Sequence, residues 1–233
     1  MNAFEGVRVV GIDGDDTLWH NEERFHVAQR QLAEIVGRHV EVPDLEDRLL
    51  AVERRNLGLF GYGVKGFTLS MIETAVEVTG GQVAGGEVQE LVEVGRRMLE
   101  SPVVLLEGVE EAVDRLASAG LRLVLLTKGD LFDQEARVAR AGIADRFWQV
   151  EVVSEKDVAT YRRVLERLEV DPREFLMVGN SLRSDVLPAL AIGAAAVWVP
   201  YPLTWSLEHA DRPAGGQRFA EISSLRELPD LLV

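Results

Sequence analysis

The chain has 233 residues, 47% of them hydrophobic and 27% charged, which is enough for a large domain, or a core domain with a smaller companion, to bury a sizeable core. The net charge of −14 at pH 7 disfavours nucleic acid and anionic membranes as partners, because both bind basic surfaces. The absence of cysteine excludes disulfides, thiolate chemistry and cysteine-based zinc sites.

No apolar run has the length needed to span a membrane, and the first twelve residues lack the basic head and long apolar core of a signal peptide. We therefore expect a cytoplasmic protein. Its oligomeric state is expected to be a monomer or a homodimer.

Short apolar runs alternate with helical patterns along most of the chain. The runs that predict buried strands are 7–12, 121–127, 174–180 and 194–200. The patterns that predict helices are 108–120, 130–142 and 158–170. Strands that alternate with helices favour an α/β fold with a doubly wound, mostly parallel sheet.

Residues 20–100 break this alternation, because they contain helical patterns but no convincing strand. The simplest interpretation is an all-helical domain of residues 20–100 inserted into an α/β core of residues 1–19 and 101–233. The segment "LFGYGVKGF" (59–67) has three glycines and predicts a loop between two helices of the insert.

Acidic side chains crowd the end of the first predicted strand, in "DGDDT" (13–17). Ligands of open α/β sheets bind at the carboxyl ends of the strands, where Asp13, Thr127 and Asn180 are all predicted to lie. The carboxylates are suited to bind a hard cation such as Mg²⁺, or to divide between a nucleophile and a proton carrier. Taken alone, the same letters also fit an acidic turn that caps a helix.

Four segments resemble, in order, the four motifs of the haloacid dehalogenase superfamily. "VVGIDGDDTLW" (9–19) is similar to the first motif, a strand followed by Asp-x-Asp-x-Thr, and "LVLLTKG" (123–129) to the second, a strand ending in Ser or Thr. "SEKDVATYRRVLERL" (154–168) is similar to the third, whose lysine precedes a helix. "FLMVGNSLRSDVLPALAIGA" (175–194) is similar to the fourth, and the helical insert would be a cap.

The resemblance implies a role for each matching residue. Asp13 would be the nucleophile that forms a covalent aspartyl intermediate, and Asp15 would protonate the leaving alcohol and later deprotonate water. Thr127 would bind a phosphoryl oxygen, and Lys156 would neutralise charge. The implied Mg²⁺ ligands are Asp13, the backbone carbonyl of Asp15, Asn180 and Asp185.

This sequence departs from the family pattern in three places. Asn180 stands where the family more often has an acid, so we expect weaker metal affinity. Asp16 replaces a common glycine, and we assign it no catalytic role. The third motif lacks its usual proline, which leaves Lys128 as a rival to Lys156 for the phosphate.

Asp15 discriminates among the reactions of the family. Its dehalogenases and its carbon–phosphorus hydrolases lack an acid here, whereas a phosphomonoesterase needs one to protonate an alkoxide. The sequence thus favours a Mg²⁺-dependent hydrolase of a small phosphorylated metabolite. The alternatives are a phosphomutase or phosphotransferase, a 2-haloacid dehalogenase, and a weakly active metabolite-binding protein.

Contacts beyond the phosphate are expected from the cap. Tyr62, Lys65 and Phe67, in the predicted 59–67 loop, are candidates to reach the substrate, although packing between helices explains the same residues. His20 is expected to be a solvated residue of the hinge, and Trp19 to pack where the cap joins the core.

Overall fold

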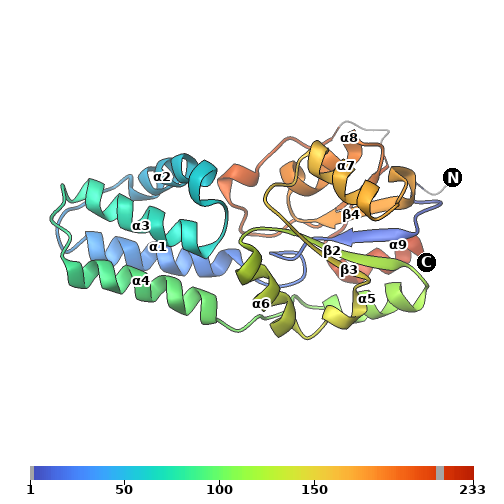
Figure 1. Ribbon diagram of the computed structural model, residues 1–233, viewed down its shortest axis with the longest axis horizontal. Helices are drawn as coiled ribbons and strands as arrows, with labels where there is room; N and C mark the ends of the chain where they lie inside the picture. The colour runs from blue at the N-terminus through green and yellow to red at the C-terminus, as the bar shows by residue number, and fades with distance from the viewer. Residues whose placement is uncertain (1–2, 214–217) are drawn as a thin grey trace. The chain divides into compact units, whose positions relative to one another are not determined.

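The computed structural model describes residues 3–213 and 218–233, and in this part of the chain one parallel sheet organises the larger of two compact units (Figure 1). The described strands lie in the order β3-β2-β1-β4-β5-β6, and all neighbours pair in parallel. Their bounds are β1 (Val9–Ile12), β2 (Arg122–Lys128), β3 (Gln149–Val153), β4 (Phe175–Gly179), β5 (Ala195–Trp198) and β6 (Phe219–Glu221). The predicted α/β fold with a parallel sheet is confirmed.

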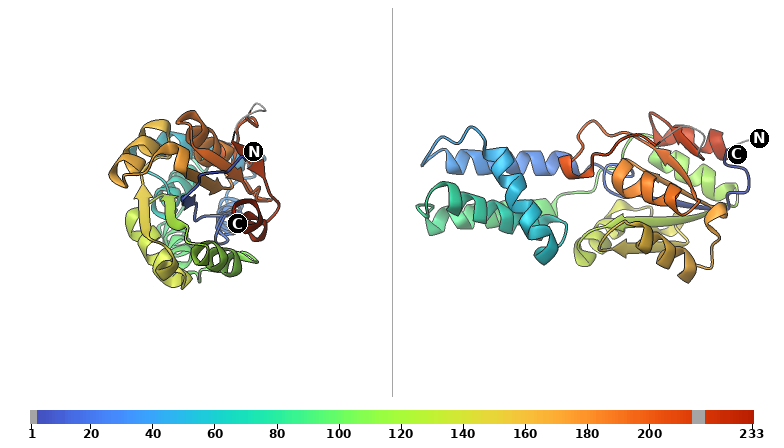
Figure 2. Two further views of the ribbon diagram at one scale, coloured as in Figure 1. Left: turned by 90° about the vertical axis from the view of Figure 1, so that its right-hand side faces the viewer. Right: turned by 90° about the horizontal axis from the view of Figure 1, so that it is seen from above.

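Helices cover both faces of this sheet (Figure 1 and Figure 2). They are α5 (Val109–Ser118), α6 (Leu131–Ala141), α7 (Val158–Arg167), α8 (Leu187–Ala191) and α9 (Leu228–Leu232). Successive side chains of a strand point to opposite faces, so Val10 packs in one apolar cluster with α5, α6 and α9. Val9 packs in a second cluster with α7 and α8, and the sheet is therefore doubly wound.

Each of the four predicted strands is present, but the sequence patterns missed β3 and β6. Both lie at the edges of the sheet, and β3 carries Gln149 and Glu151 within its five residues. β6 has only three residues, none of them buried. Edge strands bury less of their surface than central ones and so lack the apolar run by which the central strands were recognised.

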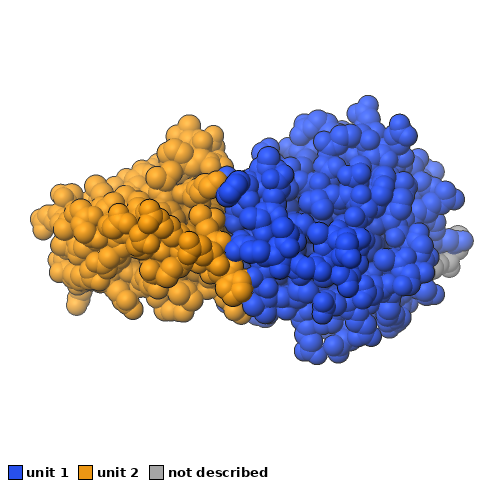
Figure 3. Space-filling view, turned by 60° about the horizontal axis from the view of Figure 1, so that its bottom comes forward, with its two compact units in different colours: residues 1–22, 103–233 blue, residues 23–102 orange. Residues whose placement is uncertain are grey.

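The second unit, residues 23–102, is all-helical in the described chain, and Figure 3 colours it separately. Its helices are α1 (Glu22–Val36, whose first residue belongs to the larger unit), α2 (Leu45–Phe60), α3 (Val64–Val78) and α4 (Gly85–Glu100). They enclose an apolar core that includes Leu32, Leu49 and Met71. The helical insertion between the first two strands is thus present. No described helix combines the length and the apolar character needed to cross a membrane.

The predicted loop over residues 59–67 is wrong in its extent. Helix α2 continues to Phe60, and α3 begins at Val64, so only three residues separate them. Gly61 and Gly63 have φ angles of 72° and 101°, which favour glycine and permit so tight a turn. Lys65 and Phe67 consequently lie in the first turn of α3 instead of in a loop.

Candidate active site

The carboxyl ends of β1, β2 and β4 meet at one edge of the sheet. Ile12, the last residue of β1, is in register with Leu125 of β2 and Val178 of β4. The next residue, Asp13, donates its backbone N–H to the Val178 carbonyl at 2.9 Å. This register places the loops that begin at Asp13 and Asn180, and the end of β2 at Thr127 and Lys128, around a common point. Such a point is the usual ligand position in these sheets.

Asp13 and Asp185 share one lysine. The Lys156 ammonium donates to Asp13 Oδ1 at 2.5 Å and to Asp185 Oδ1 at 2.7 Å. All three side chains are buried, with at most 9% of each exposed. Thr17 Oγ1 donates to the other carboxylate oxygen of Asp13 at 3.1 Å. Residues 143 positions apart in the chain thus form one buried charge cluster.

The net charge of this cluster depends on whether Asp13 is ionised. Burial raises the pKa of Asp13 to about 7, although the attraction of Lys156 works against it. Burial also opposes the charged form of Lys156, but the two carboxylates outweigh it and raise its pKa above the ordinary value. When both acids are ionised, the single ammonium balances only one of them, and the cluster has a net negative charge that a bound cation would neutralise.

A glycine allows Asp185 to approach the sheet. A Cβ atom on Gly179, the last residue of β4, would lie 2.1 Å from Asp185 Oδ2, so no other residue fits without displacing the acid. The backbone N–H of Ser181 donates to the same oxygen at 3.0 Å. Asp185 lies inside the π-type turn Leu182–Val186 that precedes α8.

Thr127 and Asn180 complete this edge of the site. The Thr127 hydroxyl is buried and has no hydrogen-bond partner among the described residues. Buried hydroxyls are rarely left without a partner, so an oxygen of a bound ligand is the natural acceptor. The Asn180 backbone N–H donates to Thr17 Oγ1 at 3.0 Å, and its side-chain oxygen lies 3.5 Å from the same hydroxyl.

The donor atoms at this edge suit a hard cation such as Mg²⁺, because all of them are oxygens. Within the described chain, no three His, Cys, Asp or Glu side chains converge in the manner of a metal cluster. A cation here would therefore depend on two carboxylates, Asp13 and Asp185, assisted by the Asn180 amide and the Asp15 backbone carbonyl.

Lys128 has different partners from Lys156. Its ammonium donates to Glu208 at 2.6 Å and to Ser184 at 3.0 Å. Glu208 also accepts from the hydroxyls of Ser181 and Ser184. Burial disfavours its charge, but Lys128 and the two hydroxyls outweigh burial and lower its pKa. The sequence analysis missed Glu208, since nothing in the short 3₁₀ helix Ser206–Glu208 marks it as a partner of Lys128.

Asp15 is held by three side chains, none of which was predicted to contact it; Trp19 was expected only to pack where the cap joins the core. Trp19 Nε1 donates to Asp15 Oδ1 at 2.7 Å, as does Arg137 Nη1 at 2.5 Å. Gln134 Nε2 donates to Oδ2 at 2.9 Å. Gln134 and Arg137 occupy buried positions of α6, and a charged residue on the inward face of an amphipathic helix is the signal that would have identified Arg137.

Asp16 serves the structure of the same loop. Its φ of 60° lies in the left-handed region, which explains why glycine suits this position. Its carboxylate accepts from the backbone N–H groups of Asn21 and Glu22 at 2.8 and 3.1 Å, and so satisfies the start of α1. Burial, followed by the charge of Asp15, raises the pKa of Asp16 to about 7.

We expect Asp16→Ala to lower the free energy of unfolding by about 1–3 kcal/mol, because the buried N–H of Asn21 and the partly buried N–H of Glu22 lose their acceptor. Asp16→Gly loses the same bonds but relieves the left-handed backbone, so it should be less destabilising than the alanine variant by about 1 kcal/mol. Urea denaturation of both variants measures the difference. Equal destabilisation would contradict the account of strain at this residue.

The remaining sequence candidates lie in two places. His20 Nδ1 is 2.7 Å from the Tyr201 hydroxyl, which ties the segment after the first loop to the segment after β5. In the helical unit, Lys65 is exposed and Tyr62 is half-buried. Phe67 is 4% exposed and packs edge-on against Phe25, so its position serves the core of that unit.

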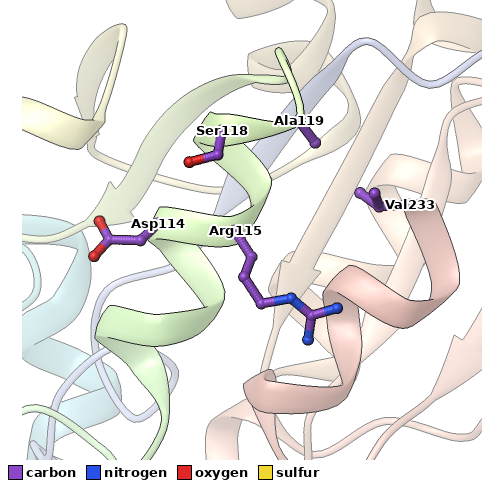
Figure 4. Close-up of a pocket in the computed structure, with 5 residues that line it drawn as sticks. All are labelled: Asp114, Arg115, Ser118, Ala119 and Val233. Carbon is purple, nitrogen blue, oxygen red and sulfur yellow. The ribbon is translucent and has the colours of Figure 1, made fainter.

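A shallow hollow lies elsewhere on the larger unit, between α5 and the last residue of the chain (Figure 4). Asp114 and Arg115 line it. Both already form ion pairs, Asp114 with Arg146 and Arg115 with Asp230. None of the residues predicted to carry chemistry contributes to this hollow.

A parallel sheet with an Asp-x-Asp loop after its first strand, and a helical insertion directly behind that loop, is the architecture of the haloacid dehalogenase-like class. The family model of the haloacid dehalogenase-like hydrolases matches residues 7–193, and the chain belongs to this family.

Named relatives agree with this assignment. A haloacid dehalogenase-like family hydrolase from Xanthomonas campestris is 44% identical, with a TM-score of 0.86 over 97% of this chain and 90% of that one. The glyceraldehyde 3-phosphate phosphatase of Pyrococcus furiosus is 25% identical over 97% of this chain and 92% of that protein. Its namesake from Pyrococcus abyssi is 32% identical over 99 residues, which are 40% of this chain and 42% of that protein.

Proposed function

We propose that this hydrolase is a Mg²⁺-dependent phosphomonoesterase that acts on a small phosphorylated metabolite through an aspartyl-phosphate intermediate. The observation that carries the proposal is the buried cluster of Asp13, Lys156 and Asp185, with the unpartnered Thr127 hydroxyl at the same edge of the sheet. The relatives named as phosphatases of a sugar phosphate support the choice of substrate class.

The proposed reaction has two displacements at phosphorus. In the first, Asp13 attacks, the bond from phosphorus to the ester oxygen breaks, and the leaving alkoxide takes a proton from Asp15. In the second, Asp15 removes a proton from water, which attacks phosphorus and breaks its bond to Asp13, releasing inorganic phosphate. Lys156 and Thr127 would bind phosphoryl oxygens whose charge increases in both transition states.

The charge of the site supports a cation. Asp13 and Asp185 share the single charge of Lys156, Asp15 is balanced by Arg137, and Lys128 is balanced by Glu208. A bound Mg²⁺ would supply the positive charge needed to accept a phosphate dianion and to stabilise the transferring group. In this proposal Lys156 is the phosphate-neutralising lysine, and Lys128 supports the loop around it.

Specificity beyond the phosphate is proposed to come from the helical unit. Tyr62 and Lys65 remain the candidate contacts, because neither is buried in the core of that unit. Phe67 is not kept among them, since it packs against Phe25.

The proposal is tested by assaying the purified protein with 4-nitrophenyl phosphate and a panel of sugar phosphates and nucleotides, with Mg²⁺ and with EDTA. Metal-dependent release of phosphate is expected. Halide release from 2-haloacids without metal would favour a dehalogenase instead. Binding of a metabolite without turnover of any ester would favour a binding protein.

Asn180→Asp is expected to lower the Mg²⁺ concentration that gives half-maximal activity, by about tenfold, because a carboxylate replaces a neutral ligand of a hard cation. The measurement is a Mg²⁺ titration of 4-nitrophenyl phosphate hydrolysis at saturating substrate. The matched control is Asn180→Ala, which removes the side-chain oxygen and should raise the same concentration. A shift in the same direction for both variants would show that Asn180 is not a ligand.

A further inference from the structure

Arg137 carries a deeply buried charge, and it has no role in the two displacements at phosphorus as they are described above. It lies in the middle of α6 and is 1% exposed. Burying a guanidinium is costly, and the cost is offset only where good acceptors surround it. Its Nη1 donates to Asp15 Oδ1 at 2.5 Å and to Asn21 Oδ1 at 2.8 Å, and its Nη2 lies 3.5 Å from the His20 carbonyl.

The two oxygens of Asp15 are held differently. Oδ1 receives the charged guanidinium of Arg137 and the indole N–H of Trp19, and the guanidinium also lies over the Trp19 ring at 5.5 Å. Oδ2 receives only the neutral amide of Gln134 among the described residues. A charge-assisted hydrogen bond is stronger than a neutral one, so Oδ1 is the anchored oxygen and Oδ2 the exchangeable one.

We propose that Arg137 is a positioning residue that, together with Trp19, fixes Asp15 through Oδ1 and leaves Oδ2 to carry the proton. The proposal rests on the proposed phosphatase function. The proton then passes from Oδ2 to the leaving ester oxygen as the first bond at phosphorus breaks, and from water back to Oδ2 in the second step. Gln134 releases Oδ2 when the substrate oxygen takes its place.

Charge separation explains why such an anchor is needed. Asp13 and Asp15 are two residues apart in one loop, so like charges on the two carboxylates repel each other. Lys156 pairs with Asp13, and Arg137 pairs with Asp15. The two acids of the loop are therefore paired with different cations, although Lys156 is shared with Asp185, and the two can take different chemical roles.

The test compares substrates that differ only in their leaving group. An alkoxide needs a proton when it leaves, whereas 4-nitrophenoxide hardly does, so kcat/KM for n-propyl phosphate depends on Asp15 far more than kcat/KM for 4-nitrophenyl phosphate. For Arg137→Met we expect kcat/KM to fall about 10- to 100-fold more with n-propyl phosphate than with 4-nitrophenyl phosphate. This difference is part of the rate enhancement that a well-positioned general acid contributes. Arg137→Lys should bring the ratio of the two kcat/KM values part of the way back to that of the wild type, because an ammonium still donates to Oδ1.

Arg140→Met is the matched control. Arg140 is an exposed arginine of the same helix that donates to the Ala136 carbonyl, and its removal should leave the ratio between the two substrates at the wild-type value. Circular dichroism and thermal unfolding establish whether each variant folds. If Arg137→Met does not fold, Trp19→Phe removes the other donor to Oδ1, keeps an aromatic ring and should change the ratio in the same direction.

The outcomes separate this inference from the proposed function. A folded variant that loses activity equally with both esters, or loses none, overturns the positioning role of Arg137 and leaves the phosphatase intact. A wild-type protein that hydrolyses neither ester in the presence of Mg²⁺ overturns the proposed function, and this inference with it.

Discussion

Asp13→Asn is expected to abolish phosphomonoester hydrolysis, with a loss of kcat of about 10⁴-fold or more, the size of effect seen when a nucleophile is removed. An amide oxygen is a poor nucleophile, and the substituted side chain cannot form the acyl phosphate through which the proposed reaction proceeds. The measurement is steady-state hydrolysis of 4-nitrophenyl phosphate with saturating Mg²⁺.

The same variant should keep or slightly raise the stability of the fold. Asp13 is buried, and burial raises its pKa to about 7, so its negative charge is disfavoured where it stands. Removing that charge leaves Lys156 paired one-to-one with Asp185. A thermal unfolding midpoint at or above the wild-type value is therefore expected. An inactive variant with a much lower midpoint would mean that activity was lost through the fold and not through the nucleophile.

Lys156→Met should have the largest effect on stability, lowering the free energy of unfolding by about 3–5 kcal/mol, because breaking a buried ion pair leaves uncompensated charge. Here two buried carboxylates, Asp13 and Asp185, lose the ammonium that they share. Turnover should fall by about 10²–10³-fold or more, since a donor to the transferring group is lost with it. Urea denaturation in EDTA measures the stability without a contribution from bound metal.

The loss of stability in Lys156→Met should depend on pH. In the wild type the pKa of Asp13 is already raised to about 7, and removal of Lys156, which lowers it, must raise it further. A carboxyl with a raised pKa binds more protons in the folded state than in the unfolded chain, so stability falls as the pH rises through this range. The destabilisation should consequently be smaller at pH 5 than at pH 8.

A double variant provides the control for charge. Asp13→Asn combined with Lys156→Met removes one carboxylate together with the lysine, so it should be more stable than Lys156→Met alone by about 1–3 kcal/mol. Additive effects of the two substitutions would contradict a direct interaction between these side chains.

The patterns that could be recognised in the sequence are local ones. The four central strands are continuous apolar runs because each is buried on both faces, and the burial of β4 along its whole length illustrates this. Asp13, Thr127 and Asn180 could be placed at strand ends because a chain position relative to a strand needs no knowledge of tertiary contacts. The edge strands β3 and β6, which are less buried, could not be recognised in the same way.

Partners could not be chosen from the sequence, and the two lysines show why. Lys128 directly follows Thr127 and was a reasonable rival for the phosphate, yet it contacts Glu208 and Ser184. Lys156, in another loop, contacts Asp13. Which ammonium reaches the nucleophile depends on the paths of loops that are distant in the chain, and short-range patterns carry no information about those paths.

The amino-acid sequence alone determined the α/β class, the helical insertion and the acidic loop, because burial, turn formation and strand ends depend on residues that are close together in the chain. Only the tertiary structure decided how the charges are paired. Asp185 reaches Lys156 across a glycine that leaves no room for a Cβ, and Arg137 crosses from α6 to Asp15. The physical reason is that an ion pair is selected by distance in space, which the fold sets only after the strands have assembled.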